Sequence, residues 1–363
     1  MKIDHNEILY KVDWDILKSY INNNLIIANK HPDYDLYTLL YTPKVVSKNL
    51  WDLYTLSSNG LVIDSEGNVI GRPFKKIRNL EDYVCYEIPI TEEFDVSEKL
   101  DGSQILLFYY KKFDEWLISS KKSFINDHTK QATKLFDVKL FNNLNKEDTY
   151  IFELIYPENK KIVNYGNIRK LVLIGCINSE FGIEQYQEDL KGYYSKYFKT
   201  VNKINIRTLK ELNTLKTQNS ENKEGVVVRF INGFRVKLLF DEYNELNSII
   251  SNINNIVIWE KLKNNYDFHK LDSKTSKDLY AQIRHIIDSL NHQYNDIERE
   301  ALKEFINIFH NKNIKDRNEF AKEAIKSPNV HRKILFDLYD KKAYGDTIWE
   351  LIKPEYNEIL IKK

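Results

Sequence analysis

Cysteine is scarce in this chain of 363 residues, which also lacks long apolar runs and any large excess of one charge. Its two cysteines, Cys85 and Cys176, are too few for a disulfide framework or a cysteine-rich zinc site, and they indicate a reducing compartment. No apolar run approaches the roughly 18–20 residues of a membrane helix, and we expect no signal peptide and no membrane partner. The sequence therefore predicts a soluble cytoplasmic protein, acting in the host cytoplasm if it is viral.

The net charge of +1 argues against a basic surface that covers the whole molecule. Nucleic-acid binding depends strongly on neutralising phosphates, so any such surface must be a local groove. The 42% of hydrophobic residues can bury substantial cores and argue against disorder. At this length two domains are expected, and nothing in the sequence points to an obligate protein partner.

Residues 1–244 predict an α+β domain dominated by antiparallel sheet, because short alternating apolar runs are separated by turn residues. One helix is expected over residues 129–144. The expected hairpins and strands cover residues 60–74, 103–124, 149–157, 170–178 and 225–240, with turns at 65–68, 111–115 and 232–233.

Residues 245–363 predict a second, all-helical domain. Turn signals are few in this part, and apolar residues recur at the three- and four-residue steps of an amphipathic helix. These residues are Leu279, Ile283, Ile286, Ile287, Leu290, Tyr294, Ile297, Ala301, Phe305 and Phe309.

The stretch "SEKLDGSQILLFYY" places Lys99 and Gly102 just before an apolar strand. A free lysine is protonated at neutral pH, but burial and nearby cations lower the pKa of its amine and can make it a covalent nucleophile. We therefore expect a lowered pKa for Lys99. A polar turn before a strand would account for this tetrapeptide equally well.

Three further charged residues lie within or beside predicted strands. Glu153 is inside an apolar strand, where a carboxylate requires a partner. Glu224 precedes the strand of "GVVVRF", and Lys237 lies in the returning strand of that hairpin. A buried salt bridge and an exposed edge charge remain alternative explanations for these residues.

In this order, "EKLDGS", "SSKKSF", "FELIYPENKKIVNYG", "LVLIGC", "EGVVVRF" and "RVKLLFDEY" resemble the motifs of covalent nucleotidyltransferases, the polynucleotide ligases and capping enzymes. The stretches around them narrow the resemblance to the bacteriophage-type RNA ligase 1 family. That family has an antiparallel-sheet, ATP-grasp-like nucleotidyltransferase domain, here residues 1–244, followed by an all-helical domain, here 245–363, to which we assign RNA binding and specificity.

The resemblance implies an ATP-dependent RNA ligase that requires Mg²⁺, with Mn²⁺ as a substitute. Lys99 would form a lysyl-AMP intermediate, AMP would pass to an RNA 5′-phosphate, and a 3′-hydroxyl would displace it, in the repair of RNA such as cleaved tRNA. The nucleotide-binding residues implied are Lys76, Gly102, Lys121, Glu153, Glu224, Lys237 and Tyr243, with Glu224 also implied as the metal ligand. Tyr41 aligns loosely with the same site.

Two departures from the family pattern remove cations. Asn59 stands where arginine is usual, and Leu239 stands where a second lysine is usual, while Lys122 replaces a glycine. Arg235, Lys75 or Lys122 could compensate, and we expect slow self-adenylylation. The alternatives left open are a non-catalytic RNA-binding relic, a capping guanylyltransferase and a DNA ligase. The last two usually carry a β-barrel after the final motif, where this chain is predicted to be helical.

Overall fold

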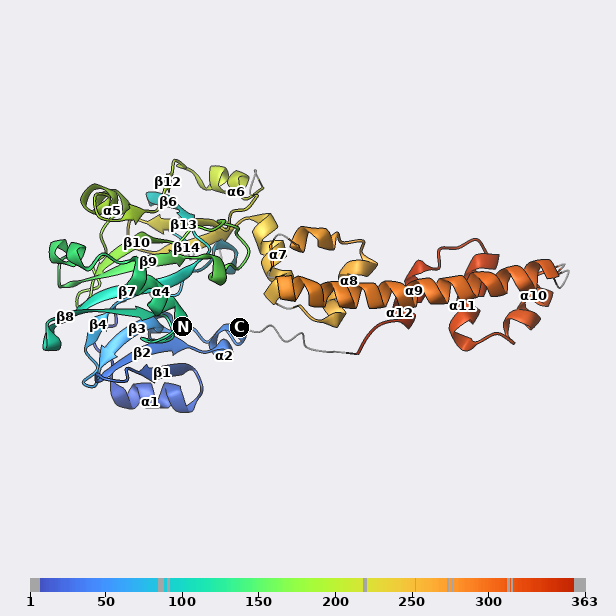
Figure 1. Ribbon diagram of the computed structural model, residues 1–363, viewed down its shortest axis with the longest axis horizontal. Coiled ribbons are helices and arrows are strands. Elements are labelled where there is room, and N and C mark those ends of the chain that lie inside the picture. Colours follow the sequence, from blue (N-terminus) through green and yellow to red (C-terminus); the bar gives the residue numbers. More distant parts are fainter. Residues whose placement is uncertain are drawn as a thin grey trace. The chain divides into compact units, whose positions relative to one another are not determined.

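The computed structural model describes residues 7–355 except 84–87, 90–91, 218–220, 252, 273, 276, 312–313 and 315, so Cys85 lies outside the described residues. The chain divides into two compact units, Met1–Asn244 and Glu245–Lys363 (Figure 1). Cys176 is buried and free. No helix among the described residues is long and apolar enough to cross a membrane.

The first sheet is antiparallel and pairs its four strands in sequence order. Helix α1 (Trp14–Asn22), capped by the Asp13 side chain, covers one face with an apolar cluster that includes Leu17 and Leu39. The short helices α2 (Pro43–Ser47) and α3 (Leu53–Ser57) lie between the second and third strands. The strands are β1 (Ile26–Lys30), β2 (Leu36–Tyr41), β3 (Asn59–Asp64) and β4 (Val69–Gly71).

The second sheet has the order β11-β10-β9-β7-β8 and buries apolar side chains on both faces. One face packs against the first sheet through residues such as Phe108, and the other carries α4 (Asp127–Leu135) and α5 (Gln187–Tyr194). The strands are β7 (Ser103–Tyr110), β8 (Glu115–Ser120), β9 (Asp148–Ile155), β10 (Lys170–Asn178) and β11 (Lys199–Thr200).

The third sheet has the order β12-β6-β13-β14-β5 and buries one face under α6 (Leu209–Thr217). Its register sets the site, because Lys99 at the end of β6 pairs with Gly225, which pairs in turn with Leu239. The strands are β5 (Arg78–Asn79), β6 (Phe94–Lys99), β12 (Lys203–Ile204), β13 (Gly225–Phe230) and β14 (Arg235–Leu239).

The predicted α+β class and hairpins are confirmed, whereas the helix expected over residues 129–144 is wrong in its second half. Helix α4 ends at Leu135, where Phe136 turns to an extended backbone. Asp137 then caps a separate 3₁₀ segment, Val138–Asn143, by accepting a hydrogen bond from the Lys139 N–H at 3.0 Å. The apolar run is thus divided between two elements.

The described part of the second unit is helical, as expected. Its long helix α9 (Lys277–Asn311) carries the predicted apolar stripe, of which Ile283 and Ala301 are fully buried, whereas Phe309 is exposed. Helices α8, α10, α11 and α12 pack against α9. The helices are α7 (Asp241–Ser251), α8 (Asn255–Lys263), α10 (Arg317–Ala324), α11 (Asn329–Tyr339) and α12 (Gly345–Leu351).

Candidate active site

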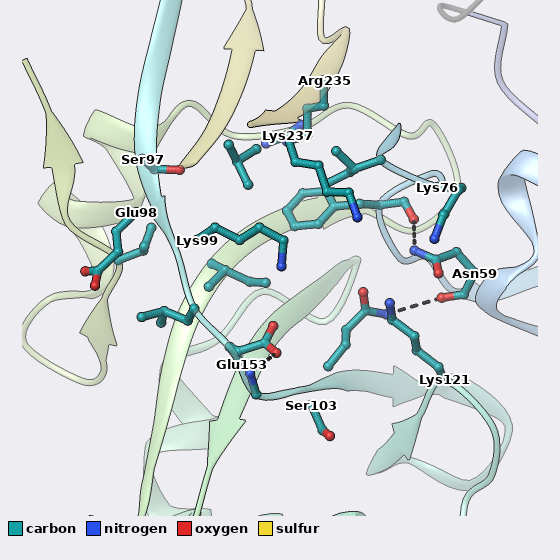
Figure 2. A pocket seen from close by; sticks show the side chains of 18 of the residues that line it. Asn59, Lys76, Ser97, Glu98, Lys99, Ser103, Lys121, Glu153, Arg235 and Lys237 are labelled. Carbon is teal, nitrogen blue, oxygen red and sulfur yellow. Dashed lines mark hydrogen bonds between the residues drawn. The ribbon is translucent and has the colours of Figure 1, made fainter. Parts of the chain in front are cut away.

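A cavity of about 330 Å³ opens where the second and third sheets face each other. Figure 2 shows Lys99 and Lys237 extending into the same space from neighbouring parts of the third sheet, with Glu153 on the wall formed by the second sheet. The lining includes eight lysine or arginine residues and three aspartate or glutamate residues. The cavity therefore suits a polyanion.

Lys99 forms an ion pair with Glu224, the residue that precedes β13. Its Nζ lies 2.6 Å from Glu224 Oε1, and the two side chains are 24% and 8% exposed. Burial lowers the pKa of the Lys99 amine, but the carboxylates of Glu224 and Glu153 outweigh burial, so that pKa lies above its ordinary value. The expected lowering of the Lys99 pKa is therefore wrong for the ligand-free site, because the attraction of these carboxylates exceeds the effect of burial.

Three other lysines carry the lowered pKa that was expected of Lys99. Burial and the neighbouring Lys76 lower the pKa of Lys121 to about 7. Burial and the charge of Lys99 lower the pKa of Lys237 to about 8, and the same two causes lower the pKa of Lys76. Lys76 donates a hydrogen bond from Nζ to the Tyr41 hydroxyl at 2.7 Å, so Tyr41 positions this lysine. These amines gain most from an added negative charge.

Gly102 and Glu153 are fitted to each other. The Gly102 N–H donates to Glu153 Oε1 at 3.1 Å, and a Cβ on Gly102 would lie 2.5 Å from the Leu154 carbonyl oxygen. Any larger residue at position 102 would push the turn after Lys99 away from β9. Burial raises the pKa of Glu153 despite the surrounding lysines.

Asp101 is buried and joins three separate segments of the chain. Its Oδ2 accepts hydrogen bonds from the backbone N–H groups of Ile162 and Val163, both at 3.0 Å, and its Oδ1 accepts from the Tyr243 hydroxyl at 3.1 Å. Burial and the nearby Glu224 raise the pKa of Tyr243. Tyr243 is therefore linked to the site through the hydrogen bond that it donates to Asp101.

Of the two positions that depart from the family pattern, Asn59 lies in the cavity wall and Leu239 lies on β14 of the third sheet. Asn59 lines the cavity, donates from Nδ2 to the Phe74 carbonyl at 3.0 Å, and has a buried Oδ1 without a hydrogen-bond partner among the described residues (Figure 2). Leu239 is half-buried on β14, on the same face as Arg235 and Lys237.

Of the three suggested compensating cations, only Lys122 is left for a ligand. Arg235 is paired with both oxygens of Glu184, and Lys75 donates to the Glu7 carbonyl. Lys122 is exposed and lines the cavity. Sequence reasoning did not reveal the Glu184 pairing, because nothing in the local pattern links a loop carboxylate to β14.

Sequence reasoning also missed several residues that line the cavity. Phe74 fits against Gly175, where a Cβ would lie 2.1 Å from the ring, and it precedes Lys76 by two residues. Lys161 and His128 also line the cavity. Lys161 belongs to the quoted motif "PENKKIVNYG", so its signal was present. His128 follows "SSKKSF" by four residues and carried no signal of its own.

The sequence model of an RNA ligase family, the bacteriophage-type RNA ligase 1 family, matches residues 58–244 of this chain. No curated protein matches the chain.

Several solved structures are similar at low identity. A putative ATP-dependent DNA ligase from Aquifex aeolicus is 18% identical over 80% of this chain and 81% of that chain, with a TM-score of 0.47. An archaeal ATP-dependent RNA ligase is 13% identical over 79% of each chain, with a TM-score of 0.48. A mutant Naegleria gruberi RNA ligase with ATP and Mn is 16% identical over 47% of this chain and 57% of that chain, with a TM-score of 0.39.

The family match spans more than half of the chain and contains all the site residues that the resemblance implied, from Lys76 to Tyr243. The chain belongs to the bacteriophage-type RNA ligase 1 family.

Proposed function

We propose that this RNA ligase uses ATP to join 5′-phosphate and 3′-hydroxyl ends of RNA through a lysyl-AMP intermediate on Lys99. The observation that most supports the proposal is the position of Lys99. Its amine is held 2.6 Å from Glu224 in a cavity where lysine and arginine outnumber acidic residues. Self-adenylylation needs this combination of a nucleophile, a proton acceptor and cations around phosphate.

In the first step, the Lys99 amine would attack the α-phosphorus of ATP. A P–N bond forms, the bond from that phosphorus to the bridging oxygen of the β-phosphate breaks, and pyrophosphate leaves. The amine must first lose its proton, because the ligand-free site keeps it charged. Glu224 is the group placed to take that proton, since its Oε1 is the nearest acceptor at 2.6 Å.

Lys76, Lys121 and Lys237 would surround the phosphates. Their lowered pKa values mean that the ligand-free site holds these charges against mutual repulsion. A bound triphosphate relieves the repulsion, and charge that develops on the leaving pyrophosphate is stabilised by donors already in place.

A divalent metal ion, Mg²⁺ or Mn²⁺, fits the site through Glu224. Its buried Oε2 has no hydrogen-bond partner among the described residues, which suits a ligand atom that awaits a cation. No group of three or more His, Cys, Asp or Glu side chains in the described chain could hold a metal by itself. Mg²⁺ commonly binds through one or two carboxylates, substrate phosphates and water, and it neutralises phosphate charge when bound.

We assign the nucleotidyl chemistry to residues 1–244 and RNA binding and specificity to the helical residues 245–363. AMP would pass from Lys99 to the 5′-phosphate of RNA, and the 3′-hydroxyl of the other end would then displace it. RNA repair, with cleaved tRNA as one substrate, is part of this proposal. So is action in the cytoplasm, which the free thiol of Cys176 supports.

Asn59 and Leu239 lead us to propose that self-adenylylation is slow in this chain. Each replaces a cation near the phosphates, and a hydrogen bond to a charged group contributes about 1.5–3 kcal/mol. The pairing of Arg235 with Glu184 leaves that guanidinium engaged elsewhere. Sealing of RNA that already carries a 5′-adenylate would be affected less, because it does not require the triphosphate.

Incubation with labelled ATP and Mg²⁺ tests the proposal. We expect a covalent AMP adduct that peptide mapping places on Lys99 and that Lys99→Ala removes, with no adduct from GTP. An adduct on another residue would refute it, and a preference for GTP would favour capping chemistry. Sealing assays on single-stranded, nicked-duplex and cleaved-tRNA substrates, with and without a preformed 5′-adenylate, then identify the RNA and the slow step.

A further inference from the structure

The cavity around Lys99 extends past the four lysines of the nucleotide site. Lys122, Asn126, His128 and Lys161 also line it. Lys122 and Asn126 come from the segment that links β8 to α4, His128 from the first turn of α4, and Lys161 from the loop after β9. Lys122 and Lys161 are not among the nucleotide-binding residues that the resemblance implied, although Lys122 could also compensate there.

Lys161 links the nucleotide site to these residues. Its amine donates to the Gly102 carbonyl and lies 3.9 Å from Asp101 Oδ1, so it is fixed beside the turn that follows Lys99. Its charge contributes to lowering the pKa of both Lys121 and His128. Lys161 is therefore the common neighbour of the nucleotide site and of His128.

His128 is half-buried in the first turn of α4. Its Nδ1 lies 2.9 Å from the Tyr156 hydroxyl. When that hydroxyl donates to Nδ1, the ring carries its proton on Nε2, which can then donate to a phosphate oxygen. Burial and the charges of Lys161 and Lys122 lower the pKa of His128, while Asp127 opposes this effect.

Lys122 has a fixed backbone although its side chain is exposed. Its carbonyl accepts hydrogen bonds from Asn29 Nδ2 at 2.7 Å and from Thr38 Oγ1 at 3.2 Å. The two arginines of the cavity wall share one carboxylate, since Arg229 lies 3.4 Å from Glu184 and Arg235 is paired with it. The Lys161 ammonium has three donors, so it can bind an anion besides the Gly102 carbonyl and Asp101. A second anion that enters the cavity therefore meets Lys122, Lys161 and His128.

We propose that Lys122, His128 and Lys161 form the binding site for the 5′-phosphate of the RNA that receives AMP. This inference rests on the proposed function, which requires such a phosphate close to the lysyl-AMP. An oxygen of the 5′-phosphate attacks the phosphorus of lysyl-AMP. A P–O bond forms, the P–N bond breaks, and the Lys99 amine leaves with a proton, so that AMP ends on the RNA as a 5′–5′ pyrophosphate linkage.

Binding of two RNA probes tests the site without any reaction. A fluorescent single-stranded RNA is prepared with either a 5′-phosphate or a 5′-hydroxyl, and its anisotropy is titrated with the full chain in the absence of ATP and metal. We expect the wild-type chain to bind the phosphorylated RNA about tenfold more tightly, since charge-assisted contacts to phosphate are strong. Lys122→Gly and His128→Gln should remove most of that preference and leave binding of the 5′-hydroxyl RNA unchanged.

His128→Gln should form the AMP adduct from ATP at the wild-type rate and transfer AMP to 5′-phosphorylated RNA with a raised half-saturating RNA concentration. Lys122→Gly is compared in the binding titration alone, because Lys122 is also a compensating cation for the nucleotide site. Lys130→Ala, an exposed lysine on the same helix, is the matched control and should keep the preference. A wild-type chain without preference, or variants that retain it, would overturn the inference. Absence of any AMP adduct in the wild type would instead overturn the proposed function, and the binding result would still decide the phosphate site.

Discussion

Nucleotide binding to the cluster of Lys76, Lys121 and Lys237 should be accompanied by proton uptake. The pKa of Lys121 is about 7 and that of Lys237 about 8 in the ligand-free site. A bound triphosphate favours the charged form of each amine and raises both pKa values towards the ordinary value of about 10.4. Each lysine that is neutral before binding must then take up a proton.

The magnitude follows from these two pKa values. At about pH 8 the two amines together lack roughly one and a half protons, which binding supplies. The sign is such that affinity falls as pH rises. If both amines are fully charged in the complex, binding weakens by roughly two to three orders of magnitude between about pH 7 and pH 9.

Calorimetry measures this uptake directly. The ligand is an ATP analogue with a methylene group between the α- and β-phosphates, which cannot transfer AMP, and the titration is repeated in buffers with different ionisation enthalpies. The apparent enthalpy should depend on the buffer at pH 8, where the terminal phosphate of the analogue is already ionised and the lysines must take their protons from the buffer. Lys121→Met should lower the uptake by about one proton at pH 8, whereas Lys130→Met should not change it. An apparent enthalpy that is independent of buffer at pH 8 would refute the reasoning.

Three further predictions concern single positions. Lys99→Arg keeps a cation beside Glu224 but supplies no nucleophile, so thermal unfolding should be unchanged and mass spectrometry should find no adduct with ATP. An adduct would contradict the assignment. Asn59→Arg combined with Leu239→Lys should raise the rate of self-adenylylation about tenfold or more without changing the sealing of pre-adenylated RNA. If the double variant and the wild type self-adenylylate at equal rates in single-turnover assays, the missing cations are not limiting. In Gly225→Ala the new Cβ would lie 2.1 Å from the Leu238 carbonyl oxygen, at a backbone φ of +155°. The free energy of unfolding should therefore fall by about 2 kcal/mol or more, as measured by thermal unfolding. Unchanged stability would contradict the local geometry.

Much of the fold could be predicted from local sequence signals. Strand alternation and turn residues placed the hairpin of β13 and β14 correctly, with Asn232 and Gly233 at its turn, because both signals act over a few residues. The end of α4 could not be predicted in the same way. An apolar helical period continues past Leu135, and the break depends on the extended backbone at Phe136 and on the cap supplied by Asp137.

For the site as well, local motifs predicted which residues take part, whereas the contacts between residues distant in sequence could not be predicted. The order of the motifs predicted that Lys99, Glu224 and Lys237 share one site. In the structure Lys99 and Lys237 line one cavity, and Glu224 contacts Lys99 from the start of the neighbouring strand. The direction of the Lys99 pKa shift could not be foreseen, because it depends on which charge lies nearest, and the 2.6 Å approach of Glu224 is set by strands far apart in sequence. The roles assigned to these residues stay predictions for the experiments above.

The contacts of Asp101 bear on how degenerate copies of such a ligase would be recognised in genomes. A carboxylate that anchors the Ile162–Val163 backbone and the Tyr243 hydroxyl contributes to the architecture whether or not catalysis occurs. A homologue that has lost its nucleophile would still be stabilised by these three hydrogen bonds. The presence of this aspartate in a sequence therefore marks shared ancestry, and a survey for active copies should weigh the position of Lys99 instead.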